Sequence, residues 1–108
     1  MSNVYENLDI GLQEYVAHLQ ADYDSKGGNQ FIEFHYEMGR KYVHVIMKHI
    51  GQFSIGQRSS HSWILINDDK QFKQGDILKS ASWKAPARNF SRGNVLCGGF
   101  KHIKWAGI

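Results

Sequence analysis

Apolar residues recur with a helical period near the start of the chain. Within residues 3–25 they fall on one face of a helix with 3.6 residues per turn, at Leu8, Leu12, Tyr15, Val16, Leu19 and Tyr23. Asn3 is placed to cap the N-terminus with Glu6 three residues later, and residues 27–28 (Gly-Gly) are placed to end the helix. We therefore predict an amphipathic helix over residues 3–25, in which Gly11 is an unfavourable interior residue.

The pattern then changes to a period of two, which is typical of strands with one buried face. Residues 31–38 and 41–49 alternate in this way, residues 60–67 form a third strand, and residues 76–79 form a short fourth one. Residues 100–105 alternate again and are predicted to form an edge strand. Because no helix-length pattern separates the strands, we expect hairpin connections and an antiparallel sheet.

The turn between the first two strands predicts how they pair. Residues 39–40 (Gly-Arg) fit a two-residue type II′ turn with Gly first. This register places Tyr36 opposite Val43 on the apolar face and His35 opposite His44 on the other face. Two imidazoles beside glutamates are metal-ligand types, but their spacing matches no metal motif. We predict no metal site and no cofactor.

These elements predict a single α+β domain spanning residues 1–108. Its N-terminal amphipathic helix packs on a small antiparallel sheet of 3–5 strands within about residues 31–79. A loop over residues 51–59 interrupts the sheet, and an irregular basic loop and tail follow at residues 80–108. A length of 108 residues fits one domain. No apolar run approaches the roughly 20 residues of a membrane helix, so we expect no membrane association.

Charge is distributed unevenly along the chain. The net charge of +3 combines two opposing parts. Residues 1–37 contain seven acids and one base, a charge of −6, whereas residues 38–108 contain twelve bases and three acids, a charge of +9. This separation favours an anionic partner for the second half. The alternative is that the acidic helix and the basic tail face each other or are simply solvated.

The basic segment over residues 75–94 carries the candidate binding site. Its site residues are Lys79, Ser82, Trp83, Lys84, Arg88, Arg92 and Asn94. Pro86, the one proline of the chain, stiffens this loop. Trp83 would stack on a base, the basic side chains would neutralise phosphates, and Ser82 and Asn94 would donate hydrogen bonds. Alternatively, Trp83 closes the open end of the core while Arg88 and Arg92 pair with the acidic helix.

The same segment resembles a widespread, uncharacterised family of small bacteriophage proteins. The similarity rests on residues 75–87 (GDILKSASWKAPA) followed by residues 92–95 (RGNV), which match the pattern G-D-x-x-K-x-A-S-W-K-x-P-A and then R-G-N with an aliphatic residue. Residues 42–46 (YVHVI) and 59–63 (SSHSW) match upstream strands loosely, and the resemblance covers about residues 31–96. It implies a phage origin and a shared fold, and it provides no catalytic residues.

Candidate catalytic residues are few. His61 follows Ser59 and Ser60 and would serve as a base for a serine nucleophile, but no orienting acid or nucleophile-elbow pattern accompanies it. Cys97 is a weak candidate nucleophile, and a buried or semi-buried thiol is the simpler expectation. With one cysteine the chain has no internal disulfide, which favours a reducing compartment. No phosphate-cradling glycine motif occurs, and we predict that the protein is not an enzyme.

These observations favour a small, non-catalytic, phage-encoded binding protein in the cytoplasm of the infected bacterium. Its basic loop around Trp83 would contact an anionic partner, most simply single-stranded nucleic acid or a nucleotide. A second hypothesis is a host-takeover or anti-defence protein that binds and inhibits a host protein, with the acidic helix imitating nucleic acid. A third is a protein that sequesters a signalling nucleotide, and a minor virion component is a fourth. The oligomeric state stays open.

Overall fold

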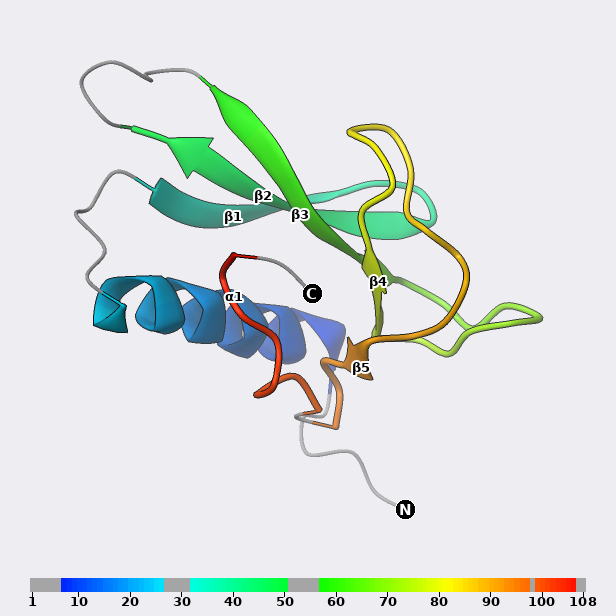
Figure 1. The fold of residues 1–108 in the computed structure, drawn as a ribbon. Coiled ribbons are helices and arrows are strands. Elements are labelled where there is room, and N and C mark those ends of the chain that lie inside the picture. Colours follow the sequence, from blue (N-terminus) through cyan, green and yellow to red (C-terminus); the bar gives the residue numbers. More distant parts are fainter. Residues whose placement is uncertain (1–6, 27–31, 51–56, 98, 107–108) are drawn as a thin grey trace.

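Figure 1 shows a computed structural model of the chain, which describes residues 7–26, 32–50, 57–97 and 99–106. The helix α1 (Leu8–Ser25) is followed by β1 (Ile32–Met38), β2 (Tyr42–His49), β3 (Arg58–Leu65), β4 (Asp76–Lys79) and β5 (Gly93–Asn94). The strands form one sheet in the order β1-β2-β3-β4-β5, and each strand is antiparallel to the next. The predicted α+β class, with one N-terminal helix on an antiparallel sheet, is confirmed.

The helix begins later than the sequence predicts. Asn7 has an extended backbone, with φ −145° and ψ 165°, and its side chain accepts a hydrogen bond from the Ile10 amide at 3.0 Å. Asn7 is therefore the N-cap, and Asp9 in the first turn faces the positive end of the helix dipole. The predicted cap Asn3 and the predicted glycine stop lie outside the described residues. In the described ranges no helix is long and apolar enough to cross a membrane.

The β1–β2 hairpin has a register shifted by two residues from the predicted one. The Gly39 amide donates to the Tyr42 carbonyl at 2.9 Å, so residues 40–41, rather than residues 39–40, are central in the turn. A Cβ on Gly39 would lie 2.9 Å from that same carbonyl oxygen, which explains the glycine beside the turn. His44 consequently faces Glu37 instead of His35. A shift of two keeps every side chain on its predicted face.

The far edge of the sheet also differs from the prediction. The strand β4 has the predicted bounds, but the next strand is β5 and not residues 100–105, which form turns and a single bridge residue at Lys104. A ring nitrogen of His18 on α1 lies 2.8 Å from the Ile103 carbonyl oxygen, and the Trp105 amide donates to Asp22 at 3.0 Å. Helix side chains therefore bind the C-terminal backbone that a strand neighbour would otherwise pair.

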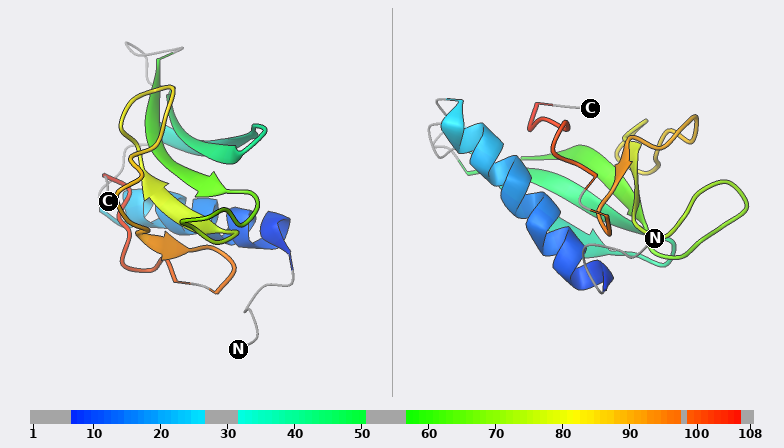
Figure 2. Two further views of the ribbon diagram at one scale, coloured as in Figure 1. Left: turned by 90° about the vertical axis from the view of Figure 1, so that its right-hand side faces the viewer. Right: turned by 90° about the horizontal axis from the view of Figure 1, so that it is seen from below.

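One face of the sheet is covered by α1 and the C-terminal segment, as Figure 2 shows. The predicted apolar stripe of α1 packs here against residues of β1 to β4 and against Val95, Phe100 and Ile103. Gly11 lies where the chain after β5 crosses the helix, and a Cβ there would lie only 2.7 Å from the Val95 carbonyl oxygen. The glycine that the sequence presents as a cost to the helix thus permits a close approach of two backbones.

A β-bulge in β3 places a chain of polar side chains in this core. The pairing of β2 with β3 shifts between Val45 and Ile46, so two consecutive residues, His61 and Ser62, both point toward α1. The Ser62 hydroxyl lies 2.7 Å from the Tyr15 hydroxyl and 2.9 Å from Nδ1 of His61. Nε2 of His61 lies 2.9 Å from the Lys104 carbonyl oxygen. Every polar atom of this buried chain therefore has a partner.

The opposite side of the sheet, which we call the outer face, carries a second and smaller apolar cluster. It consists of Trp63, Leu65, Phe72 and Leu78, with Tyr42 packed against them. Alternation along β3 and β4 explains it, because neighbouring residues such as Ile64 and Ile77 point to the helix side. No helix in the described residues covers the outer face, and the loops after β3 and β4 pack on it instead.

Candidate functional site

The segment after β4 forms a narrow loop that presents Trp83 and Lys84 at its tip. The Ala87 amide donates to the Lys79 carbonyl at 2.7 Å, and the amides of Ala81 and Ser82 both donate to the Ala85 carbonyl at 3.1 Å. We call residues 79–87 the Trp83 loop. Its backbone bonds close a hairpin-like turn, with Pro86 on the returning side. The loop is thus closed on itself by backbone hydrogen bonds.

Trp83 lies on the outer face with one side anchored and the other in solvent. Its ring is 42% exposed and meets the His44 ring edge-on, with the centroids 4.7 Å apart and an angle of 65°. The Arg58 guanidinium carbon lies 5.3 Å from the Trp83 centroid. Trp83 therefore does not close the core, which was one of the two predicted alternatives. It leaves free aromatic surface beside a cation.

A chain of hydroxyl groups ties the Trp83 loop to the sheet. His44 stacks flat on Trp63 at 3.8 Å, and its Nε2 lies 2.6 Å from the Ser60 hydroxyl. The Ser60 hydroxyl lies 2.6 Å from that of Ser80, which donates to the Ser82 carbonyl at 2.8 Å. The Ser80 hydroxyl donates its one hydrogen to that carbonyl. The Ser60 hydroxyl must therefore donate to Ser80 and accept from Nε2–H of His44. Burial lowers the pKa of His44, which favours this neutral form.

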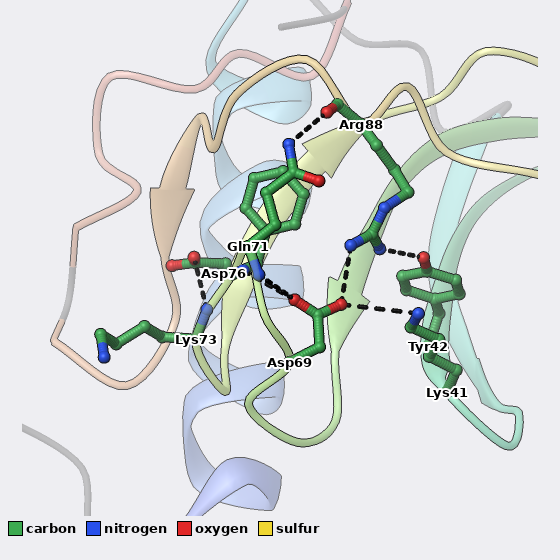
Figure 3. Close-up of polar contacts among 8 residues, drawn as sticks. Lys41, Tyr42, Asp69, Gln71, Lys73, Asp76 and Arg88 are labelled. Carbon is green, nitrogen blue, oxygen red and sulfur yellow. Dashed lines mark hydrogen bonds and ion pairs between the residues drawn. The ribbon is translucent and has the colours of Figure 1, made fainter.

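Arg88 is committed to contacts within the protein. Figure 3 shows its guanidinium bound to Asp69, at 2.7 Å from Nη2 to Oδ2, and to the Tyr42 hydroxyl. The same guanidinium lies over the Phe72 ring at 4.8 Å. Amides of Phe72 and Gln71, together with Arg88, hold the pKa of Asp69 far below its ordinary range. Arg88 thus clamps the loops to β2, and its predicted role toward an anion stays a prediction.

Arg92 and Asn94 lie away from the Trp83 loop. Asn94 in β5 pairs with Asp76, at the opposite end of β4 from Lys79. Its side chain donates to the Gln74 carbonyl at 2.9 Å and to Asp76 at 3.0 Å. The Arg92 guanidinium carbon lies 3.9 Å from the centroid of the Phe90 ring. Of the seven predicted site residues, Lys79, Ser82, Trp83 and Lys84 belong to the Trp83 loop, Arg88 directly follows it and binds Asp69, and Arg92 and Asn94 lie toward the other end of β4.

The structure adds a groove that the sequence did not predict as a site. An open depression of about 410 Å³ lies beside Trp83 on the outer face. It is lined by His35, Tyr36, Glu37, Ile46, Lys48 and Arg58. Lys48 and Arg58 are cross-strand partners, and Arg58 donates to Glu37 at 2.6 Å. The sequence assigns Arg58 to a loop, so the pairing of Arg58 with Lys48 could not be predicted from it. The sequence does contain one signal for this groove, because the period-two alternation of the strands places Glu37 and Lys48 on the face opposite the apolar one.

The remaining candidate residues take structural or solitary positions. The Ser62 hydroxyl beside His61 is completely buried, so a substrate cannot reach it. Cys97 is exposed, whereas the sequence favoured a buried or semi-buried thiol. In the described ranges no three side chains of His, Cys, Asp or Glu gather as metal ligands.

Comparison with other proteins gives one match. No curated protein and no solved structure matches this chain. One family model does match, and it covers residues 2–107, which is nearly the whole chain. Its description, Family of unknown function (DUF7717), states no activity, ligand or partner. The match is consistent with membership of an uncharacterised family, and the chain belongs to the family of unknown function DUF7717.

Proposed function

We propose that this protein binds single-stranded nucleic acid through the Trp83 loop and the adjoining outer face. The observation that carries the proposal is the half-exposed ring of Trp83, held from one side by His44 and bordered by the Arg58 guanidinium. A base that stacks on an exposed aromatic ring gains about 1–3 kcal/mol, with little dependence on its identity. A ring that is already fixed loses little conformational freedom on binding.

The charges around Trp83 support the same ligand. Lys79, Lys84 and Arg58 are exposed near the loop, where they would neutralise phosphates on either side of a stacked base. The Ser82 hydroxyl would donate a hydrogen bond to a phosphate oxygen, and its oxygen also accepts one from the Lys84 amide at 3.2 Å. Cations flanking an aromatic platform are the usual composition of single-strand binding surfaces.

We infer further that the protein is encoded by a bacteriophage, acts in the cytoplasm of the infected cell and has no catalytic role. The phage origin rests on the similarity of residues 75–87 and 92–95 to a pattern of small phage proteins. The proposal of no catalytic role is supported by the burial of the His61–Ser62 pair, which keeps this histidine and this hydroxyl from a substrate in solvent.

The test is a fluorescence anisotropy titration of a labelled single-stranded oligonucleotide at two salt concentrations. We expect wild-type protein to bind at low salt and to lose affinity as salt rises, because bound phosphates release counterions. Trp83→Ala should weaken binding by about 5- to 150-fold, which corresponds to the stacking energy of one base. Duplex DNA and free nucleotides serve as competitors that rank the ligand classes.

Matched lysine variants locate the surface. Lys84→Gln removes a cation from the tip of the Trp83 loop, whereas Lys101→Gln removes another exposed cation from the C-terminal segment. We expect only Lys84→Gln to weaken binding and reduce the salt dependence. Absence of binding at low salt, or equal losses in both variants, would refute the proposed surface.

A second candidate function is supported by the solvent-facing side of α1. Asp9, Glu14 and Asp24 are exposed there, which gives an acidic surface on the opposite side of the sheet from the outer face. Such a surface would imitate nucleic acid toward a basic host protein, which is the hypothesis of a host-takeover or anti-defence protein. Reversing the charge of Glu14 and Asp24, compared with Lys79 and Lys84, separates the two functions. Loss of activity only in the acidic variants would favour the protein partner.

A further inference from the structure

Arg58 belongs to two environments at once. Its guanidinium lies over the Trp83 ring at 5.3 Å, and the same side chain lines the groove between β1, β2 and β3. A nucleic-acid strand that leaves a base stacked on Trp83 therefore meets Arg58 next, with Lys48 adjacent across the β2–β3 ladder. Two neighbouring cations on a rigid sheet are suited to hold one phosphodiester.

We infer that the groove is a second subsite, which takes the next phosphodiester of the single strand bound at Trp83. In this subsite Arg58 and Lys48 bind the phosphate, and the Glu37 carboxylate competes with it for Arg58. The inference rests on the proposed function, because it extends the same bound strand across the sheet. It assigns to Glu37 a role that limits affinity.

The Glu37–Arg58 pair is built to be displaced. The two groups are 2.6 Å apart, yet the Arg58 side chain is 41% and the Glu37 side chain 61% exposed. Ion pairs with this exposure contribute little to stability, because water solvates both partners well. A phosphate offers the same bidentate oxygen geometry to a guanidinium. Exchange of carboxylate for phosphate therefore costs little and restores the charge pairing.

The charges that face the groove are balanced without a ligand. Lys48 and Arg58 are opposed by Glu37 within the groove and by Glu33, which is the cross-strand partner of Lys48. His35 lies 3.4 Å from Glu33 at the same edge. Removing one carboxylate leaves a net positive groove, so the affinity for an anion should rise.

The dimensions and floor of the groove fit one nucleotide unit. Its volume of about 410 Å³ lies within the range of small-ligand sites. The side chain of Ile46 is buried at the bottom of the groove. An apolar floor with cations at the rim accommodates a sugar or base below and a phosphate above.

The first experiment compares two charge-matched variants in the anisotropy titration. Glu37→Gln removes the competing carboxylate and preserves the side-chain shape, whereas Glu14→Gln makes the same change on the exposed side of α1. We expect Glu37→Gln to tighten binding by about two- to fivefold relative to Glu14→Gln, which is the affinity equivalent of one exposed ion pair. Equal affinities of the two variants would overturn the competitor role.

The second experiment removes the cation. Arg58→Gln should weaken binding about tenfold or more and lower the slope of log affinity against log salt by about 0.7, the value for one phosphate of a single strand. Arg58→Lys should give an intermediate affinity, because it keeps the charge and loses the bidentate geometry. An unchanged slope in Arg58→Gln would overturn the phosphate role.

A ligand series separates this inference from the proposed function. Thymidine monophosphate requires only the Trp83 subsite, whereas a dinucleotide reaches the groove as well. We expect a gain in affinity for the dinucleotide that disappears in Arg58→Gln. If oligonucleotides bind and Trp83→Ala weakens them but this gain is absent or survives in Arg58→Gln, the groove inference alone fails. If wild-type protein binds none of these ligands, the proposed function fails.

Discussion

The two faces of the sheet are covered in different ways. On the helix side, α1 and the C-terminal segment exclude water from a continuous core that contains Leu12, Tyr15 and Leu19 without any exposed surface. On the outer face, two loops rest on a small cluster around Trp63 and leave Trp83 and several cations in contact with solvent. The helix side therefore supplies most of the apolar burial, and the outer face holds the groups able to meet a ligand.

Polar groups reinforce this contrast. On the helix side they form a closed chain, in which Nε2–H of His61 donates to the Lys104 carbonyl and Ser62 donates to Nδ1. Burial raises the pKa of Tyr15, whose hydroxyl then donates to Ser62. On the outer face the series of hydrogen bonds from His44 to Ser80 ends at the Ser82 carbonyl, close to exposed charged side chains. A buried chain secures the fold, whereas the outer chain positions a loop.

The largest contrast is expected from one truncation on each face. Leu19→Ala should lower the free energy of unfolding by about 2–5 kcal/mol, because it opens a cavity in the sealed core. Trp83→Ala should cost less than about 1 kcal/mol, because much of the ring is already in water. Urea unfolding measures both, and the binding assay should give the reverse ranking. Similar losses of stability would show that the outer face is also a structural core.

A second test concerns the close contact on the helix side. By helix propensity alone, Gly11→Ala should stabilise α1 by up to about 1 kcal/mol. The contact with the Val95 carbonyl reverses the sign, and we expect a net destabilisation of about 1–3 kcal/mol. Ala17→Gly, at an exposed position of the same helix, calibrates the propensity effect. A stabilised Gly11→Ala variant would show that the chain after β5 moves aside without cost.

The sequence predicted the elements of the fold better than their relative positions. Periodicity correctly gave the helix stripe and the strand faces, because burial imposes it directly. It did not distinguish turns centred on residues 39–40 and 40–41, since a register shift of two preserves every face. The helix start had a similar ambiguity, because Asn3 and Asn7 offer the same capping chemistry. The bulge that turns His61 inward has no signature in the alternation.

The candidate site was predicted in part for a related reason. Local composition located the exposed tip of the Trp83 loop, and the exposure of Lys84 and Trp83 depends mainly on that local turn. The binding of Arg88 by Asp69 depends on a contact between separate loops, and no spacing along the chain encodes it. The groove required the pairing of Lys48 with Arg58, which appears only once the register is known.

A third and smaller effect is expected at the loops of the outer face. The Asp69 carboxylate accepts hydrogen bonds from the amides of Gln71 and Phe72 and from the Arg88 guanidinium. Asp69→Asn removes the negative charge of this group. We expect faster hydrogen exchange at those two amides and little change at the amides of α1, because the outer loops open separately from the core. Asp68→Asn, one residue away, is the matched control, because its side chain accepts from the Gln74 amide and not from those of Gln71 and Phe72. Equal acceleration in α1 would show that both faces unfold as one unit.

The smallest effect is expected from pH and acts on the helix side. Burial lowers the pKa of His61 below the value of about 6.5 that histidine has in the unfolded chain. As pH falls, the unfolded chain therefore binds a proton at His61 before the folded protein does. The contribution of His61 is fully present above the unfolded pKa and is lost as pH falls through it toward the lower folded value. Protonation also places a proton on Nδ1, where Ser62 now donates.

The urea concentration at the midpoint of unfolding should therefore decrease as the pH is lowered from neutral to 5. His61→Gln should flatten this dependence, whereas His35→Gln, at an exposed position of the outer face, should leave it as in wild type. The slope with pH is the readout, so a lower overall stability of the His61 variant does not obscure it. His44 on the outer face also has a lowered pKa, and the flattening is expected to be partial for that reason. If the slope in His61→Gln equals that of wild type, the sealed core does not carry the pH response, and the contrast between the faces fails at this point.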